Sequence, residues 1–179
     1  KLLSECSAKS MAPFALNIFE VLCLCLNCKG MFSVRVVAAG AIPKTVKTVF
    51  ADPQAAGVSV ADAYGRIAIP ALLAQMEQED GEEELEPLCI IADAVSDCTK
   101  DAKECGVRLP ADVITKVFSQ CAKTARESIE RRMGMIMMLG EEGGGDALAR
   151  EEAAERQDWE QDLMTSCVDA MGWVMKVEG

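Results

Sequence analysis

Apolar helical segments recur along this chain at intervals of about 50 residues, and this periodicity constrains the fold more than any other feature. The first helix of each expected pair begins near Met11, Val60 and Pro110. A single helix pair cannot bury both of its apolar faces, so it stacks on its neighbours and leaves an elongated surface exposed. The spacing therefore predicts an all-α protein built as a right-handed α-solenoid, a superhelix of antiparallel helix pairs.

Breaker residues divide the chain into the helices of three expected pairs. Residues 1–8 are interpreted as the end of an upstream helix, and the pairs occupy residues 11–50, 60–106 and 110–178. We expect individual helices over 11–28, 32–50, 60–78, 82–106, 110–140 and 146–177. Pro43 and Pro70 lie inside two of them and predict kinks, because proline removes an amide donor and crowds the preceding turn. The chain begins without methionine or a secretory leader, so we expect a segment of a longer protein.

The fourth, fifth and sixth helices carry the clearest apolar stripes, with apolar residues three and four positions apart. The fourth stripe is Leu85, Leu88, Cys89, Ala92, Val95, Thr99 and Ala102. The fifth is Ile114, Val117, Phe118, Cys121, Ala125, Ile129, Met133 and Ile136. The sixth is Trp159, Leu163, Cys167, Ala170 and Val174.

Composition favours protein partners over other ligands. The 179 residues carry a net charge of −11 and no histidine, which disfavours nucleic acid and removes the commonest metal ligand and acid–base group. Asn17 and Glu20 interrupt the most apolar stretch, Met11 to Cys28, so we expect no membrane span. The nine cysteines are odd in number and mostly lie in helical patterns, which indicates a reducing compartment.

No residue pattern predicts catalytic, cofactor or metal chemistry. Cys23, Cys25 and Cys28 lack a second cysteine cluster, so we interpret them as small buried apolar side chains. The run from Met133 to Met138 is expected to fill the core, although exposed methionines would suit an adaptable binding surface. The acidic runs at 77–84 and 141–146 are expected to be solvated loops and caps, with binding of basic partners as the alternative.

A family resemblance rests on the segment from Val34-Arg35 to Ala39 with Pro43, and on three later segments. A valine–arginine pair before small residues at the start of a second helix is typical of HEAT repeats. The later segments are Leu109-Pro110, the long helix through Ile129–Arg132, and Arg150–Asp162 before Leu163. Together they resemble the C-terminal half of importin-β superfamily receptors, and are most similar to the karyopherin beta-three branch.

This resemblance implies a nuclear transport receptor that binds basic cargo proteins and the GTPase Ran, works in cytoplasm and nucleus, and has nucleoporins as candidate partners. It implies no cofactor, and the second helix of each pair would line an inner concave surface. The candidate residues on that surface are Arg35, Lys44, Asp93, Asp97, Asp101, Glu155, Trp159 and Asp162. For Arg35 we expect a structural contact to the neighbouring repeat ahead of a place on this surface. Two rival functions are a HEAT scaffold of a phosphatase or vesicle coat, and an all-α enzyme or ligand-binding bundle.

Overall fold

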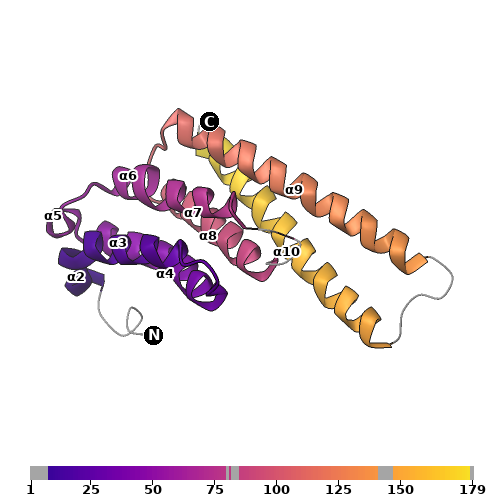
Figure 1. Cartoon of the computed structure of the whole chain (residues 1–179). Coiled ribbons are helices and arrows are strands. Elements are labelled where there is room, and N and C mark those ends of the chain that lie inside the picture. The colour runs from indigo at the N-terminus through magenta and orange to yellow at the C-terminus, as the bar shows by residue number, and fades with distance from the viewer. Residues whose placement is uncertain (1–7, 80, 82–84, 141–146, 178–179) are drawn as a thin grey trace.

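The computed structural model describes residues 8–79, 81, 85–140 and 147–177, and all regular structure within them is helical, as predicted (Figure 1). The expected upstream helix over residues 1–8 lies almost entirely outside this part of the chain. The first region comprises α2 (Ala8–Met11), η1 (Ala12–Phe14), α3 (Ala15–Leu26), α4 (Phe32–Ala51) and α5 (Pro53–Ala56). The middle region comprises α6 (Val60–Asp62), η2 (Ala63–Ala68), α7 (Ile69–Met76) and α8 (Leu85–Glu104). The last comprises α9 (Ala111–Gly140) and α10 (Ala147–Val177).

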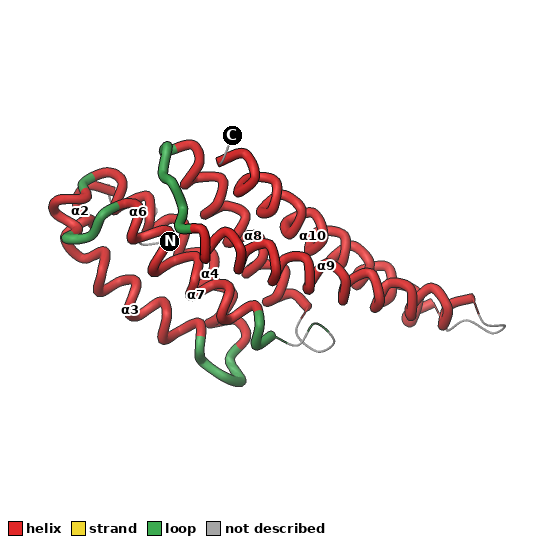
Figure 2. Tube along the Cα trace, turned by 90° about the horizontal axis from the view of Figure 1, so that it is seen from above, coloured by secondary structure: helices red, strands yellow, loops and turns green. Residues whose placement is uncertain are grey.

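Helices that follow each other in sequence pack as pairs, and the pairs contact one another in chain order. Helix α3 packs on α4, α7 on α8, and α9 on α10. Between pairs, α8 packs on both α4 and α10, whereas α7 contacts α3 and α9. One layer thus contains α3, α7 and α9, and the other contains α4, α8 and α10. The long helices α9 and α10 extend as an arm beyond the shorter helices (Figure 2).

Local sequence explains where the helices begin and end. The Ser59 hydroxyl accepts a hydrogen bond from the Asp62 amide at 3.1 Å, which is an N-cap. Gly106 follows α8 with a φ of +66°, a left-handed conformation that favours glycine. The expected loop at 51–57 instead contains the short helix α5, because Asp52 caps the amide of Ala55 at 3.0 Å.

The two internal prolines have different effects. Helix α4 is continuous through the buried Pro43. Before Pro70 the chain forms a wider π-helical segment, Ala63–Ala68, in which the Ile69 amide donates to the Tyr64 carbonyl. A proline cannot donate to the carbonyl four residues earlier and its ring crowds that carbonyl, so the preceding turn widens. The predicted irregularity at Pro70 is therefore present as a π-helix.

The fourth and sixth apolar stripes form the core, as predicted. Every member of the α8 stripe is buried. In α10, Leu163, Cys167, Ala170 and Val174 are fully buried, and Trp159 is half-buried against them.

The fifth stripe was predicted correctly only in its first half. Val117 and Cys121 are buried, but Ile129, Met133 and Ile136 are 46%, 53% and 65% exposed. The distal half of α9 lies in the arm, beyond the helix α7 that packs on α9. The expectation that the methionine run fills the core is therefore wrong for Met133, and also for Met137, which is 66% exposed.

The N-terminal cysteines and the first long segment also differ from expectation. Cys23, Cys25 and Cys28 are half-buried rather than buried, whereas Cys89 and Cys98 lie in the core. The segment Lys9–Leu26 is long and apolar enough, by length and composition, to cross a membrane, contrary to the sequence expectation. In this structure it packs along α4 and is only partly buried.

Candidate functional site: an acidic face on α8 and α10

Three aspartates follow one edge of α8 at four-residue intervals. Asp93 and Asp97 are exposed and Asp101 is half-buried, on the side of the helix opposite its apolar stripe. Because each helical residue advances about 1.5 Å, their α-carbons lie about 6 Å apart along the axis. Helix periodicity alone therefore produces a row of carboxylates.

Helix α10 lies parallel to α8 and adds a fourth carboxylate to this row. The Cys89 thiol donates to the Trp159 carbonyl at 3.2 Å. Near the other end of both helices, the Lys103 ammonium lies 5.9 Å from the Trp173 ring centre. Between these contacts, Asp162 of α10 comes close enough to Asp93 of α8 to act on its carboxylate. We refer to Asp93, Asp97, Asp101 and Asp162 as the acidic face.

The surroundings of Asp93 raise its pKa above the ordinary value of 3.8. Partial burial is the largest cause, and the carboxylates of Asp97 and Asp162 raise it further. The Ser166 side chain opposes this shift through a hydrogen bond to the carboxylate. The face is therefore a region of concentrated negative potential, which attracts cationic groups.

Lys47 of α4 joins the edge of the acidic face. Its ammonium lies 3.1 Å from Asp101 Oδ2, and the lysine side chain is 61% exposed. Its pKa is raised, mainly by the hydrogen bond to Asp101, with weaker attraction from Asp101 and Asp97 and an opposing effect of burial. Lys47 is therefore an exposed cation held at this edge by the carboxylates.

The other predicted surface residues are distributed differently. Lys44 and Glu155 are exposed, and Trp159 is half-buried with its ring in the α8–α10 packing. Arg35 is 3% exposed, so its placement on an accessible surface was wrong. Its guanidinium instead donates to both carboxylate oxygens of Glu79, at 2.9 and 3.1 Å, across to the next helix pair. The expected structural contact of Arg35 to the neighbouring helix pair is the one observed.

A second buried arginine–carboxylate pair was not predicted. Arg131 of α9 donates to both oxygens of Glu160 of α10, one of them at 2.9 Å, and Glu160 is fully buried. The available sequence signal was a glutamate directly beside Trp159 on the apolar stripe of α10. Sequence could not identify its partner, because residues 29 positions apart become neighbours only when the two long helices pack together.

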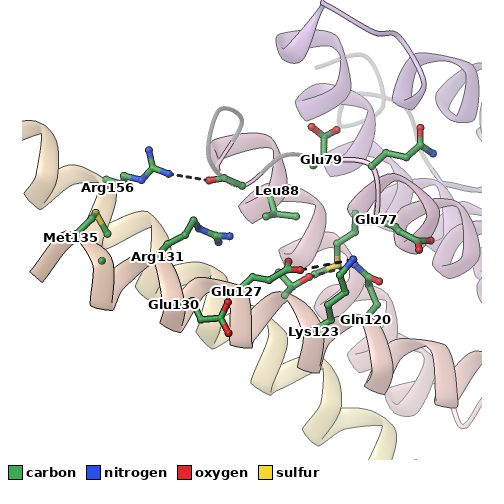
Figure 3. A pocket seen from close by; sticks show the side chains of 15 residues that line it. Glu77, Glu79, Leu88, Gln120, Lys123, Glu127, Glu130, Arg131, Met135 and Arg156 are labelled. Atoms are coloured by element: carbon green, nitrogen blue, oxygen red, sulfur yellow. Dashed lines mark hydrogen bonds and ion pairs between the residues drawn. The ribbon is translucent and has the colours of Figure 1, made fainter. Parts of the chain in front are cut away.

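A cavity of about 850 Å³ lies where the end of α7 meets α8 and the α9–α10 arm (Figure 3). Arg156 reaches across it to the Gly81 carbonyl at 3.2 Å. A β-carbon added to Gly81 would lie 2.6 Å from the Arg131 guanidinium, so glycine permits this close approach. Both acidic and basic side chains line the cavity, namely Glu77, Glu79, Lys123, Glu127, Glu130, Arg131 and Arg156. This mixture of charges does not select an ionic ligand of one sign.

No family model, curated protein or solved structure matches the chain.

Proposed function

We propose that the chain is a HEAT-repeat segment of a nuclear transport receptor of the importin-β superfamily, and that it binds basic cargo proteins through its acidic face. The acidic face carries this proposal. It spans two parallel helices of the layer that the family resemblance assigns to the inner surface. The carboxylates of Asp97 and Asp162 lie near enough to Asp93 to add to the rise in pKa that burial causes. The action is non-covalent binding, in which charge accelerates association and packing sets residence time.

The arrangement of exposed apolar side chains supports the stacking of helix pairs that this proposal needs. Within the described residues, the large hydrophobic side chains that are exposed belong to the first and last pairs, such as Leu24, Val37, Ile136 and Val168. The middle pair, which has a neighbour on both sides, exposes none among its described residues. Apolar end faces of this kind are typical of repeat stacks, because each pair completes its core only against a neighbour.

The experiment is a titration of the chain with a labelled lysine- and arginine-rich peptide at increasing salt concentration. The proposal predicts saturable binding that weakens as salt screens the attraction, and no binding of the same peptide with alanine at the basic positions. Binding indifferent to salt and to those substitutions would contradict it.

A competition experiment with the parent protein separates a receptor from a scaffold. In a transport receptor, GTP-bound Ran changes the affinity for cargo. In a phosphatase or coat scaffold it does not, so cargo binding unaffected by GTP-bound Ran would replace the transport proposal with the scaffold.

A further inference from the structure

Helices α9 and α10 form an antiparallel pair whose register is fixed by a contact near its middle (Figure 1). The Ser128 hydroxyl of α9 donates to the main-chain carbonyl of Glu160 of α10 at 3.3 Å. In an antiparallel pair, a step toward the N-terminus of one helix matches a step toward the C-terminus of the other. Seven residues make about two turns and return each helix to nearly the same face. Seven residues from Ser128 and from Glu160 lie Cys121 and Cys167, so these two cysteines face each other.

Both cysteines lie in the core between the two helices. Each of them is 0% exposed. The pKa of the Cys167 thiol is raised, first by a hydrogen bond with the Cys121 thiol, then by burial, and also by the charges of Cys121 and Cys89. The helix register and the hydrogen bond therefore agree that the thiols of Cys121 and Cys167 are in contact.

The other buried cysteines near this pair have different surroundings. The Cys89 thiol donates to the Trp159 carbonyl at 3.2 Å. Cys98 is also 0% exposed, and its pKa is raised by burial and by nearby aspartates rather than by another thiol. Contact with a second thiol thus distinguishes Cys121 and Cys167 from Cys89 and Cys98.

We propose that Cys121 and Cys167 are a site of reversible oxidation, at which their thiols form a disulfide between α9 and α10. The oxidant is a small disulfide such as oxidised glutathione. One protein thiol loses its proton, attacks a sulfur of the oxidised glutathione and releases one glutathione thiolate. The second protein thiol, also deprotonated, then displaces the other glutathione from the mixed disulfide. Two protein thiols and one oxidised glutathione become one protein disulfide and two reduced glutathiones, which carry the two protons.

The folded structure favours this disulfide because the two thiols are already in contact, so the second step is intramolecular. Burial slows the exchange, since each thiol reacts only while α9 and α10 separate locally, but the stability of the folded disulfide form sets the equilibrium. A cross-link between two distant positions also restricts the unfolded chain and stabilises the fold. This inference goes beyond the proposed function and holds whether or not the acidic face binds a basic partner.

The test is equilibration of the whole reduced chain in glutathione buffers of increasing oxidised-to-reduced ratio. Urea below the unfolding transition is included so that the helices open often enough to exchange. After acid quenching and blocking of the free thiols, tryptic digestion without reduction and mass spectrometry identify the linked peptides. Cleavage after lysine and arginine leaves Cys121 as the one cysteine of 117–123 and Cys167 as the one cysteine of 157–176.

We expect these two peptides to become linked at a ratio of oxidised to reduced glutathione about ten-fold or more lower than any other pair of cysteines. The linked chain should also unfold at a higher urea concentration. Cys121→Ala should abolish both the cross-link and the rise of the urea midpoint, whereas the matched control Cys98→Ala, at an equally buried cysteine of α8, should keep both. The peptide mapping uses the unaltered chain, so it does not depend on how well either variant folds.

Three results would overturn the proposal. In the first, Cys121 and Cys167 stay reduced in buffers that attach glutathione to the half-buried Cys105. In the second, Cys167 is linked to Cys89 in place of Cys121. In the third, the linked chain unfolds at a lower urea concentration than the reduced chain, because the disulfide then forms in the unfolded chain and not in the folded pair.

Discussion

Substitution of Arg131 by methionine should destabilise the chain far more than loss of an ordinary surface ion pair. Arg131 donates twice to Glu160, whose side chain is 0% exposed, and the arginine side chain itself is only 10% exposed. Removal of one partner of such a pair leaves an uncompensated buried charge, which costs about 3–5 kcal/mol. For a chain of this size each kilocalorie lowers the melting temperature by roughly 2–4 °C. We therefore expect a decrease of about 6–20 °C.

Helix α9 supplies the matched control. Lys123 and Glu127 are separated by 3.9 Å with side chains 53% and 46% exposed, so Lys123→Met should cost no more than about 0.5 kcal/mol. Because a hydrophobic pair can replace a buried ion pair at little cost, the double variant Arg131→Met/Glu160→Met should recover most of the lost stability. Urea unfolding followed by far-UV circular dichroism measures all three variants. If Arg131→Met and Lys123→Met lower the free energy of unfolding by amounts that agree within about 1 kcal/mol, the buried pair is worth no more than the exposed one.

Two further predictions concern the acidic face and a helix end. Burial raises the pKa of Asp93 above 3.8, with help from Asp97 and Asp162, so the folded state binds this proton more tightly than the unfolded state. The charged Asp93 carboxylate therefore destabilises the folded state fully above the folded pKa, and this destabilisation declines as the pH falls through that pKa. Asp93→Asn should raise the melting temperature at pH 7. A gain of equal size near pH 4 would contradict this. Gly106 has a φ of +66° with open space at its β-carbon, so Gly106→Ala should cost about 1 kcal/mol from backbone strain alone. Gly40→Ala, inside α4 with equally open space, should instead stabilise by about 0.5–1 kcal/mol, and destabilisation of the same size in both variants would contradict the assignment.

Sequence periodicity predicted the helices more reliably than the surfaces they expose. The stripe of α8 was predictable because this helix has neighbours along its whole length, so apolar spacing and burial coincide. The distal half of α9 has only α10 beside it, and there Met133 and Ile136 are exposed although they continue the same pattern. Sequence reports the apolar face of a helix, but it does not report how far the neighbouring helix extends.

The acidic face was predicted in part, and the buried ion pairs were not predicted as pairs. Asp93 and Asp97 were identifiable because four-residue spacing places them on one side of α8. The approach of Asp162 depends on the parallel packing of α8 and α10, which only the structure provides. Arg35 was listed with the surface candidates because it lies on the second helix of a pair, but its bond to Glu79, 44 positions away, allows it to be buried. The sequence predicted a contact to the neighbouring repeat but could not identify Glu79 as its partner.

The proposed binding of basic partners by the acidic face is tested most directly with a variant in which three of its carboxylates are neutralised. Asp93, Asp97 and Asp162 are replaced by asparagine, and the control replaces Glu20, Glu77 and Glu130, which are exposed and lie outside α8 and α10, by glutamine. Both variants lose three negative charges, so general attraction falls equally in the two. If the acidic face binds the peptide, the first variant loses at least ten-fold in affinity, about 1.4 kcal/mol, and the control loses much less. Equal losses in both would contradict a specific acidic face.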